Sequence, residues 1–348
     1  MDKPRYSQKP IFNIESLALR LGESPMLLNN LARNSHRLYR TVPQQKKDGS
    51  VRETFDAHQP LKAIQRKIVD RIFSGVIFPD YLHGGIRDVN SPRSIYSNVA
   101  CHAGARVVLM QDIKNFFPSI TEDKVLGVFK GVLGFGDDVS SLLVKLTTRR
   151  GVVPQGASTS SYLANLVFWD VEPRLVTWVK ANNLSYSRFA DDITISSKGD
   201  VRDELKTDVI RKVTGMLASK GFYQKRQKMH VLKKGQVIVT KGGVEPFVIT
   251  GLAVSGPNPG VAKFERKKIR AAVKEFEDLI GSGVFVSDVE NKYNSAMGRV
   301  GRLIACGQSD GIILKERLNA ARLKASVPLL EKYLAANIIP VVQAKVEE

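Results

Sequence analysis

Two adjacent carboxylates stand in an otherwise apolar stretch of the sequence. Residues 189–192 read Phe-Ala-Asp-Asp, and Ile-Thr-Ile follows. Paired carboxylates are costly in an apolar environment, and a tight turn between two strands would place Asp191 and Asp192 at a tip that a divalent cation can reach. Mg²⁺ prefers one or two carboxylates together with substrate phosphates. Because an Asp-Asp pair in a turn is more often simply solvated, this pair alone indicates no chemistry.

A third carboxylate, Asp112, ends the apolar run at 107–110. A single Asp after a strand is more often a helix cap or a surface turn. If the strand that ends at Asp112 lies beside the hairpin that carries Asp191 and Asp192, the three carboxylates form a two-metal site. Such a site activates a 3′-hydroxyl and stabilises the leaving pyrophosphate in nucleotidyl transfer.

A further motif lies between these carboxylates. Residues 153–160 read Val-Pro-Gln-Gly-Ala-Ser-Thr-Ser and open a predicted helix. Gly156 lets another group approach the backbone, and the Ser and Thr side chains can satisfy free amides at the helix start. A helix N-terminus also suits a phosphate or a template backbone. Without the other motifs, this segment would be an ordinary capped helix.

The charge balance indicates a polyanionic partner. Lys and Arg number 53 against 34 Asp and Glu, a formal net charge of +19, which favours nucleic acid before an anionic membrane surface. A basic protein without such a partner remains an alternative. No apolar run approaches the ~18 residues of a bilayer helix, and no signal peptide is recognisable, so we expect a cytoplasmic protein with no membrane partner. We find no P-loop and no hydrolase triad.

The elements that must position these residues alternate between strand-like and helical patterns. The segment 80–106 is rich in Gly, Ser, Asn and Arg and is expected to be mostly irregular, and a Pro/Gly break at 256–260 precedes a basic, helical end. These patterns predict an α+β body with an appended α domain. The predicted helices cover residues 14–21, 26–38, 60–73, 122–133, 138–147, 158–180 and 201–220. The predicted β-structure comprises a turn at 46–49, strands at 50–55 and 106–113, a hairpin at 184–197 and short runs over 231–252.

The order of these motifs resembles the palm of a reverse transcriptase. Asp112 with Phe-Phe-Pro-Ser at 116–119, Pro-Gln-Gly at 154–156, the Asp pair, and Gly-Phe at 221–222 with two lysines beyond run in family order over residues 50–255. Asn-Val-Ala-Cys-His at 98–102, Val-Ile-Thr-Gly-Leu at 248–252 and a short helical thumb are similar to the retron-type bacterial members.

The resemblance implies a fold and its subdivision. We expect an α+β right-hand polymerase of fingers, palm and thumb, with an antiparallel palm sheet. Residues 1–40 would form a helical N-terminal extension, residues 41–255 the interleaved fingers and palm, and residues 256–348 an α-helical thumb.

The resemblance also implies the catalytic centre. Asp112, Asp191 and Asp192 would be the catalytic carboxylates. They would hold two Mg²⁺ ions, for which Mn²⁺ could substitute, and the Ile113 carbonyl would be a further ligand.

Five residues match positions that bind the incoming deoxynucleotide. Phe117 matches an aromatic gate that rejects a 2′-hydroxyl, and Arg52 matches a basic residue that grips the triphosphate. Arg52 could instead be a solvated arginine of the hairpin. Lys228 matches a lysine that assists pyrophosphate departure, and it could instead be a solvated loop lysine. The set is Arg52, Phe117, Gln155, Gly156 and Lys228.

A larger set matches positions that bind RNA or primer. His102 could instead be a hydrogen-bonded structural residue, and the basic thumb residues a solvated helical face. The set is Asn98, His102, Phe189, Thr250, Gly251, Lys263, Arg266, Lys267 and Arg270.

The sequence departs from the family pattern without touching an implied metal ligand. Phe189 replaces the usual Tyr, so a phenol hydroxyl near the primer end is missing. Ser161 stands for a Pro, Val99 for an Ala, and Lys225 and Met229 for an Asn and a Thr.

The resemblance implies RNA-templated addition of dNTPs, with a cognate structured noncoding RNA as template and primer. Synthesis would start from a guanosine 2′-hydroxyl and leave a branched RNA–DNA product (msDNA), and a separate effector protein in antiphage defence is implied. Two alternatives remain: a diversity-generating or abortive-infection reverse transcriptase, and an RNA-binding scaffold whose polymerase site is idle.

Overall fold

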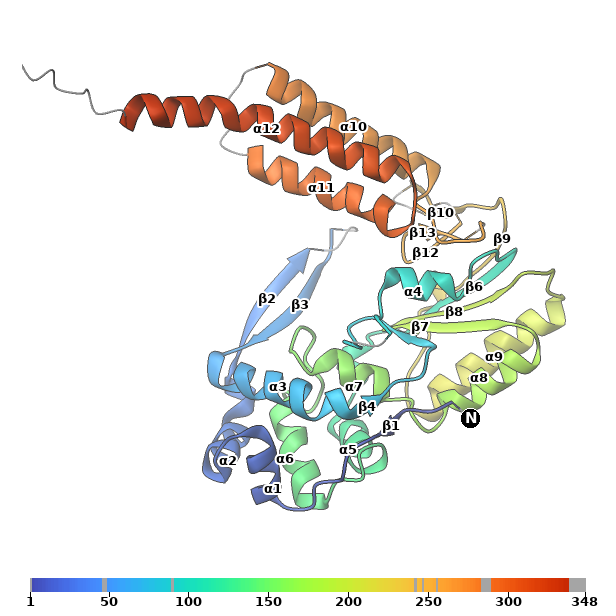
Figure 1. Cartoon of the computed structure of the whole chain (residues 1–348). Helices are drawn as coiled ribbons and strands as arrows, with labels where there is room; N and C mark the ends of the chain where they lie inside the picture. The colour runs from blue at the N-terminus through green and yellow to red at the C-terminus, as the bar shows by residue number, and fades with distance from the viewer. Residues whose placement is uncertain are drawn as a thin grey trace, which may run out of the picture. The chain divides into compact units, whose positions relative to one another are not determined.

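The computed structural model describes residues 2–45, 49–88, 91–240, 243–245, 247–254, 256–282 and 289–337 (Figure 1). Two compact units divide the chain: residues 1–250 with 254–257, and residues 251–253 with 258–348. No described helix is both long enough and apolar enough to cross a membrane.

A five-stranded sheet organises the first unit, in the order β5-β7-β8-β6-β9. The pairs β7–β8, β8–β6 and β6–β9 are antiparallel, as expected for the predicted palm sheet, whereas β5 adds a parallel edge strand. The strands are β5 (Leu82–His83), β6 (Val107–Asp112), β7 (Ser185–Phe189), β8 (Asp192–Ser197) and β9 (His230–Lys233).

The interior strand β6 is apolar on both of its faces. Val107, Val108 and Leu109 are all buried, which is the pattern of a strand covered from both sides. The helices α8 (Glu172–Ala181) and α9 (Asp203–Ser219) lie together along one face of the sheet (Figure 1).

The N-terminal helices are part of the first unit's hydrophobic core. Leu17, Leu21 and Leu28 are fully buried in the same cluster as residues of α3, α5 and α6. Side-chain caps begin α1 and α2, where Asn13 accepts from the Ser16 amide and Ser24 from the Leu27 amide. The helices of this part are α1 (Ile14–Leu21), α2 (Pro25–Asn34), η1 (Ser35–Arg37), α3 (Gln59–Arg71), η2 (Phe73–Gly75), η3 (Phe117–Ser119), α5 (Glu122–Gly131) and α6 (Asp137–Thr147).

An exposed antiparallel hairpin, β2 (Tyr39–Gln45) with β3 (Val51–Ala57), projects beside these helices. Asp56 fixes its base, because its carboxylate accepts from Arg40 at 2.7 Å and from Lys62 at 2.6 Å. Most of the predicted turn at 46–49 lies outside the described residues; Gly49, at its end, has a positive φ of 80°. A smaller pair joins β1 (Arg5–Tyr6) to β4 (Val76–Ile77).

The prediction of one helix over 158–180 is wrong. The chain forms α7 (Ser160–Leu166) and then α8, which begins at Glu172 with Pro173 in its first turn. A proline favours a helix start because it lacks the amide that an interior position needs. The amides of Val171 and Glu172 instead bond to the Phe168 carbonyl, closing the turn between the two helices.

The segment 80–106 is more ordered than predicted. It contains β5 and α4 (Ile95–Ala100), which starts with a reciprocal capping box between Ser94 and Ser97. The buried guanidinium of Arg93 donates to the carbonyls of Phe78, Pro79 and Leu82. This arginine therefore holds the loop in one conformation without regular backbone pairing.

Short β-elements follow the sheet, and a three-helix unit ends the chain. The second unit packs Val273, Phe276, Val300 and Leu303 in its interior, and Arg317 pairs with Glu277 on its surface at 2.5 Å. The remaining elements are η4 (Arg226–Lys228), β10 (Ile238–Thr240), β11 (Gly243–Glu245), β12 (Val248–Ile249), β13 (Leu252–Ala253), α10 (Lys263–Gly281), α11 (Val289–Ala305) and α12 (Asp310–Asn337).

Candidate active site

The sheet register brings the three predicted carboxylates to one end of two adjacent strands. Asp112, the last residue of β6, is the Cα partner of Asp192, the first residue of β8. The Ile113 amide donates to the Asp191 carbonyl at 3.0 Å, which ties the turn to the end of β6. Asp112 is only 6% exposed, whereas Asp192 is exposed and Asp191 is half-buried. One carboxylate therefore lies inside the site and two lie nearer its opening.

The turn between β7 and β8 is strained and held in place. Ala190 has a φ of 54°, a left-handed conformation that residues with a Cβ rarely adopt. Its amide donates to the His83 carbonyl at 3.3 Å, and its carbonyl accepts from Arg188 Nη1 at 3.1 Å. These contacts fix the backbone that carries Asp191 and Asp192.

Arg188 belongs to a fully buried ion pair directly behind the turn. Its Nε and Nη2 donate to the two oxygens of Glu172 at 2.6 and 2.8 Å, and its remaining donors reach the carbonyls of Ala164 and Asn165. The arginine and glutamate side chains are 0% and 1% exposed. Sequence reasoning missed both residues; the position of Arg188, directly before the Phe-Ala-Asp-Asp motif, was the one available signal.

Tyr186 completes this network. Its hydroxyl donates to Glu172 Oε1 at 2.7 Å. Burial, together with the neighbouring Glu172 carboxylate, raises the pKa of Tyr186 well above its ordinary value. The phenol therefore remains a proton donor to the glutamate.

The donor set fits a hard divalent cation such as Mg²⁺, because it consists of carboxylate and carbonyl oxygens on adjacent strands. Within the described part of the chain, no three His, Cys, Asp or Glu side chains converge closely enough to form a metal cluster. The fit rests on the backbone placement of Asp112, Ile113 and the Asp pair and on the chemistry of their oxygens.

The segment after Asp112 is anchored on a cluster of aromatic rings. Phe116 is buried; its ring stacks on Phe168 at 6.1 Å between centroids and contacts Phe222 in a tilted arrangement at 5.8 Å. Phe117, the predicted gate, is partly buried and opens η3. The Lys114 amide donates to the Tyr223 carbonyl, and the Lys225 amide donates to the Asp112 carbonyl. These two bonds fix the segment after Asp112 to the chain at 223–225.

The Pro-Gln-Gly loop is bonded to the hairpin strand β3. The Phe55 amide donates to the Gln155 carbonyl at 2.8 Å. Gly156 has a φ of 108°, and a Cβ at this position would lie 3.0 Å from the Phe55 carbonyl oxygen. The loop can approach the strand this closely because Gly156 has no side chain.

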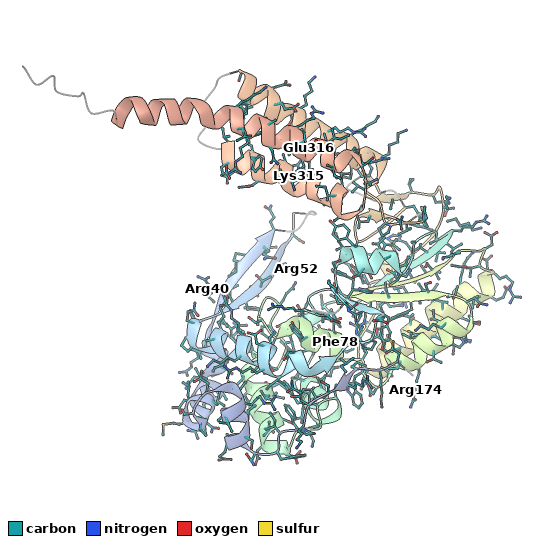
Figure 2. The ribbon with its side chains drawn as sticks, in the orientation of Figure 1. Arg40, Arg52, Phe78, Arg174, Lys315 and Glu316 are labelled. Atoms are coloured by element: carbon teal, nitrogen blue, oxygen red, sulfur yellow. The ribbon has the colours of Figure 1, made fainter. Side chains whose placement is uncertain are left out.

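For two predicted nucleotide-binding residues, no described contact links the side chain to the three carboxylates. Arg52 is an exposed residue of β3, and Figure 2 shows it and Arg40 on the hairpin. Lys228 ends η4, and its side chain lies outside the described residues.

Asn98 and His102, predicted to contact RNA, are each 1% exposed. His102 Nδ1 lies 2.7 Å from Ser196 Oγ, its Nε2 lies 2.7 Å from Ser187 Oγ, and the Ser187 hydroxyl donates to Asn98 Oδ1. Burial lowers the pKa of His102 to about 3, so the imidazole is neutral. The geometry supports the structural alternative for His102, as a residue that joins α4 to the sheet.

The other predicted RNA or primer residues lie in both units. Phe189 ends β7, and its ring packs against Gly84. A Cβ added at Gly84 would lie 3.0 Å from the Phe189 ring. Thr250 has a φ of 44°, and its hydroxyl oxygen lies 3.5 Å from Asn98 Nδ2. In the second unit, the Gly251 carbonyl accepts from Arg302 at 3.1 Å.

The predicted basic residues of the thumb lie on α10. Lys263 and Lys267 are exposed, and Arg266 is half-buried. Arg270 pairs with Asp310 at 2.8 Å, so part of its charge is already compensated within the unit.

Comparison with known proteins identifies the family of this chain. Residues 44–252 match the family model described as reverse transcriptase (RNA-dependent DNA polymerase). The retron Se72 reverse transcriptase of Salmonella heidelberg (strain 579083-10) is 33% identical over 96% of this chain and 84% of its own length. The retron Ec48 reverse transcriptase of Escherichia coli is 31% identical over 91% and 78%. The retron Ec86 reverse transcriptase of Escherichia coli is 28% identical over 78% and 81%.

The chain therefore belongs to the reverse transcriptase family and is an RNA-directed DNA polymerase. Because its likeness to retron enzymes extends along almost the whole chain, it is a retron-type reverse transcriptase.

Proposed function

We propose that this enzyme copies part of a cognate structured noncoding RNA into DNA, starting from a guanosine 2′-hydroxyl within that RNA and leaving a branched RNA–DNA product. The observation that carries the proposal is the likeness to the retron Se72 enzyme over 96% of the chain. The resemblance at 98–102 and 248–252, outside the catalytic motifs, points the same way.

In the proposed mechanism, Asp112, Asp191, Asp192 and the Ile113 carbonyl hold two divalent cations. When bound, Mg²⁺ (or Mn²⁺ in its place) lowers the pKa of the attacking hydroxyl and neutralises the developing pyrophosphate charge. The protein's contribution is positioning: the β6–β8 register sets the spacing of the carboxylates, and Arg188 holds the turn behind them.

The incoming dNTP would lie between the carboxylates and the Pro-Gln-Gly loop. Phe117 would exclude a 2′-hydroxyl, Gln155 and Gly156 would lie against the nucleotide, and Arg52 and Lys228 would meet the triphosphate. The close bonding of the Gln155 loop to β3, which also carries Arg52, supports a shared nucleotide site.

The RNA and primer would be held chiefly by Phe189, Thr250, Gly251 and the cations of α10, through contacts with the sugar-phosphate backbone. We further propose a cytoplasmic location and a separate effector protein, with a role in antiphage defence; both follow from the retron-type assignment.

Purification of the protein from its native host tests the proposal, with an Asp191→Ala/Asp192→Ala double variant beside it. We expect a discrete co-purifying DNA with a stub of attached RNA, absent from the variant. A DNA product without attached RNA would favour another class of bacterial reverse transcriptase. RNA alone in both samples would favour the idle scaffold and overturn the proposal.

A further inference from the structure

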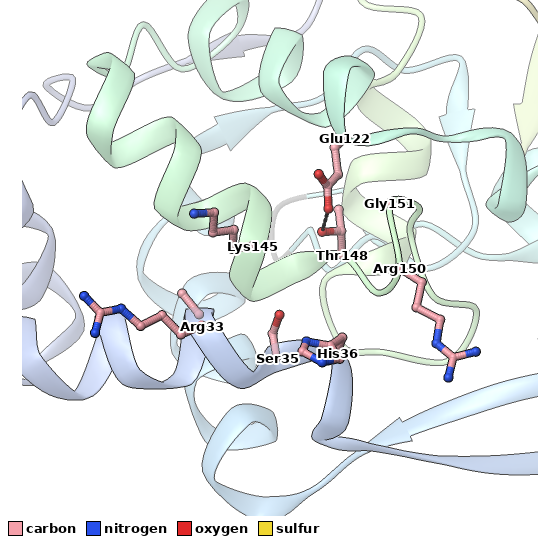
Figure 3. Close-up of a pocket in the computed structure, with 9 residues that line it drawn as sticks. Arg33, Ser35, His36, Glu122, Lys145, Thr148, Arg150 and Gly151 are labelled. Atoms are coloured by element: carbon pink, nitrogen blue, oxygen red, sulfur yellow. Dashed lines mark hydrogen bonds between the residues drawn. The ribbon is translucent and has the colours of Figure 1, made fainter.

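An open hollow of about 550 Å³ lies in the first unit, outside the catalytic centre. It is built where three elements meet: the end of α2 with η1, the end of α6, and the turn at 148–151 that follows α6. Basic groups come from all three: Arg33 and His36, Lys145, and Arg150 (Figure 3).

The lining of the hollow carries more positive than negative charge, since Glu122 is the one acidic residue in its described lining. Among the described residues, none of these four basic side chains forms a salt bridge. The carboxylate at the hollow, Glu122, accepts a hydrogen bond from the Thr148 hydroxyl at 2.9 Å instead. A concave surface with low-dielectric walls and an excess of positive charge concentrates its field on an anion.

The helix dipole can account for two of these basic residues separately, but it does not account for all four at one hollow. Arg33 and Lys145 each lie in the last turn of a helix, where a cation offsets the negative end of the dipole. Arg150 and His36 lie outside α-helices and share the same hollow. Figure 3 shows Arg33 and Lys145 to one side of the Glu122–Thr148 pair and Arg150 to the other. This spread suits an extended polyanion better than one compact phosphate.

The turn that carries Arg150 is also tied to the nucleotide-binding elements. The guanidinium of the neighbouring Arg149 lies 4.1 Å from the centroid of the Phe55 ring on β3. The amide of the same Phe55 donates to the Gln155 carbonyl. The turn that carries Arg150 is therefore linked to the Pro-Gln-Gly loop through Phe55 of β3.

We propose that this hollow binds the phosphodiester backbone of single-stranded RNA through Arg33, Lys145 and Arg150. The inference rests on the RNA-directed activity of the enzyme, and it does not depend on self-primed synthesis from a cognate RNA. Recognition would be independent of base sequence, because only phosphates meet these cations.

The test compares two triple variants of the full-length protein. Arg33→Gln/Lys145→Gln/Arg150→Gln removes three charges from the hollow. Arg174→Gln/Lys180→Gln/Arg202→Gln removes the same three charge types from exposed positions around α8 and the start of α9. Binding of a fluorescent uridine homopolymer is measured across a salt series, together with the thermal unfolding curve and the KM for dNTP on a short primer–template.

We expect weaker RNA binding in the first variant only, with the slope of log Kd against log salt reduced by about 2, as three lost single-strand phosphate contacts require. Glu122→Gln should act in the opposite direction and tighten binding, because it removes the opposing charge. Equal losses in both triple variants, or no loss in either, would overturn the proposal. An altered dNTP KM with unchanged RNA affinity would also overturn it, since the ligand would then be a free triphosphate.

Discussion

At the scale of single residues, we propose that the buried carboxylate of Asp112 and the pair at the start of the neighbouring strand form the catalytic centre. Their backbone positions follow from the antiparallel register of β6 and β8, in which Asp112 faces Asp192. A register shift of one residue would move every side chain of the strand to the other face of the sheet. We therefore expect the activity to depend on the pairing of the sheet as well as on the carboxylates themselves.

Asp112→Asn and Asp191→Asn should each lower kcat for dNTP incorporation by about 10³-fold or more. Several kcal/mol of charge stabilisation are lost with a metal ligand, and each 1.4 kcal/mol is tenfold in rate. Primer extension on an RNA template measures this effect. Asp138→Asn, an exposed change in the first turn of α6, is the control and should retain activity. Substantial extension by either catalytic variant would refute the assignment.

Arg188 should act as a positioning residue. Arg188→Lys keeps a positive charge beside Glu172 but cannot reproduce the fork that also reaches the Ala164, Asn165 and Ala190 carbonyls. The turn behind Asp191 then shifts, and a misplacement of about 1 Å can reduce kcat by about 10²-fold.

Separate kcat and KM values, taken below the unfolding temperature of each variant, test this role. A kcat effect with little change in KM for dNTP supports positioning. Arg174→Lys, an exposed change on α8, is the control. If Arg188→Lys lowers only the thermal stability and leaves kcat intact, the network is purely structural.

Sequence reasoning reached the three carboxylates because their motifs are local and ordered along the chain. It did not reach the Arg188–Glu172 pair, because these residues lie sixteen positions apart in sequence and meet only through the packing of α8 on the sheet. It also could not decide the burial of His102, whose ring contacts hydroxyls on β7 and β8 that lie 85 and 94 positions further along the sequence.

At the scale of elements, the sequence pattern predicted whether a segment is helix or strand better than it predicted where each element ends. Apolar residues recur at helical spacing on both sides of Phe168, so the pattern over 158–180 concealed the break there that separates α7 from α8. Pro173 was the local sign of that break, since proline in a helical pattern marks a boundary more often than an interior position. In the segment 80–106, a single buried side chain, Arg93, supplies the order that regular pairing does not.

Gly156→Ala should separate the Pro-Gln-Gly loop from β3. The new Cβ would lie 3.0 Å from the Phe55 carbonyl oxygen, and the φ of 108° is itself strained for alanine. We expect a loss of stability of about 1–3 kcal/mol and a raised KM for dNTP. Denaturant unfolding and steady-state incorporation measure the two effects.

The matched control is Gly235→Ala, which also has a positive φ, of 92°, but no atom within 4 Å of the added Cβ. Gly235→Ala should lose stability through backbone strain but should leave the KM for dNTP unchanged. Identical behaviour of the two variants would mean that the contact with β3 has no influence on nucleotide binding.

At the scale of the whole molecule, two features of the first unit link its stability to pH. Burial lowers the pKa of His102 to about 3 and that of His83 to about 4, the latter with a smaller contribution from Arg93. In the unfolded chain both imidazoles take up a proton near pH 6.5. The folded state therefore binds fewer protons than the unfolded state between these values.

Stability should accordingly be complete above about pH 6.5 and should fall as the pH drops toward 4, by about 1.4 kcal/mol per pH unit for each histidine. The two histidines together predict twice that slope between roughly pH 6 and 5, above the range in which most carboxylates titrate. His102→Gln should halve that slope while keeping a hydrogen-bonding group between Ser187 and Ser196. Denaturant unfolding at a series of pH values measures the slopes directly. An unchanged slope in His102→Gln would mean that the imidazole is charged inside the folded protein, which would contradict its burial between two serine hydroxyls.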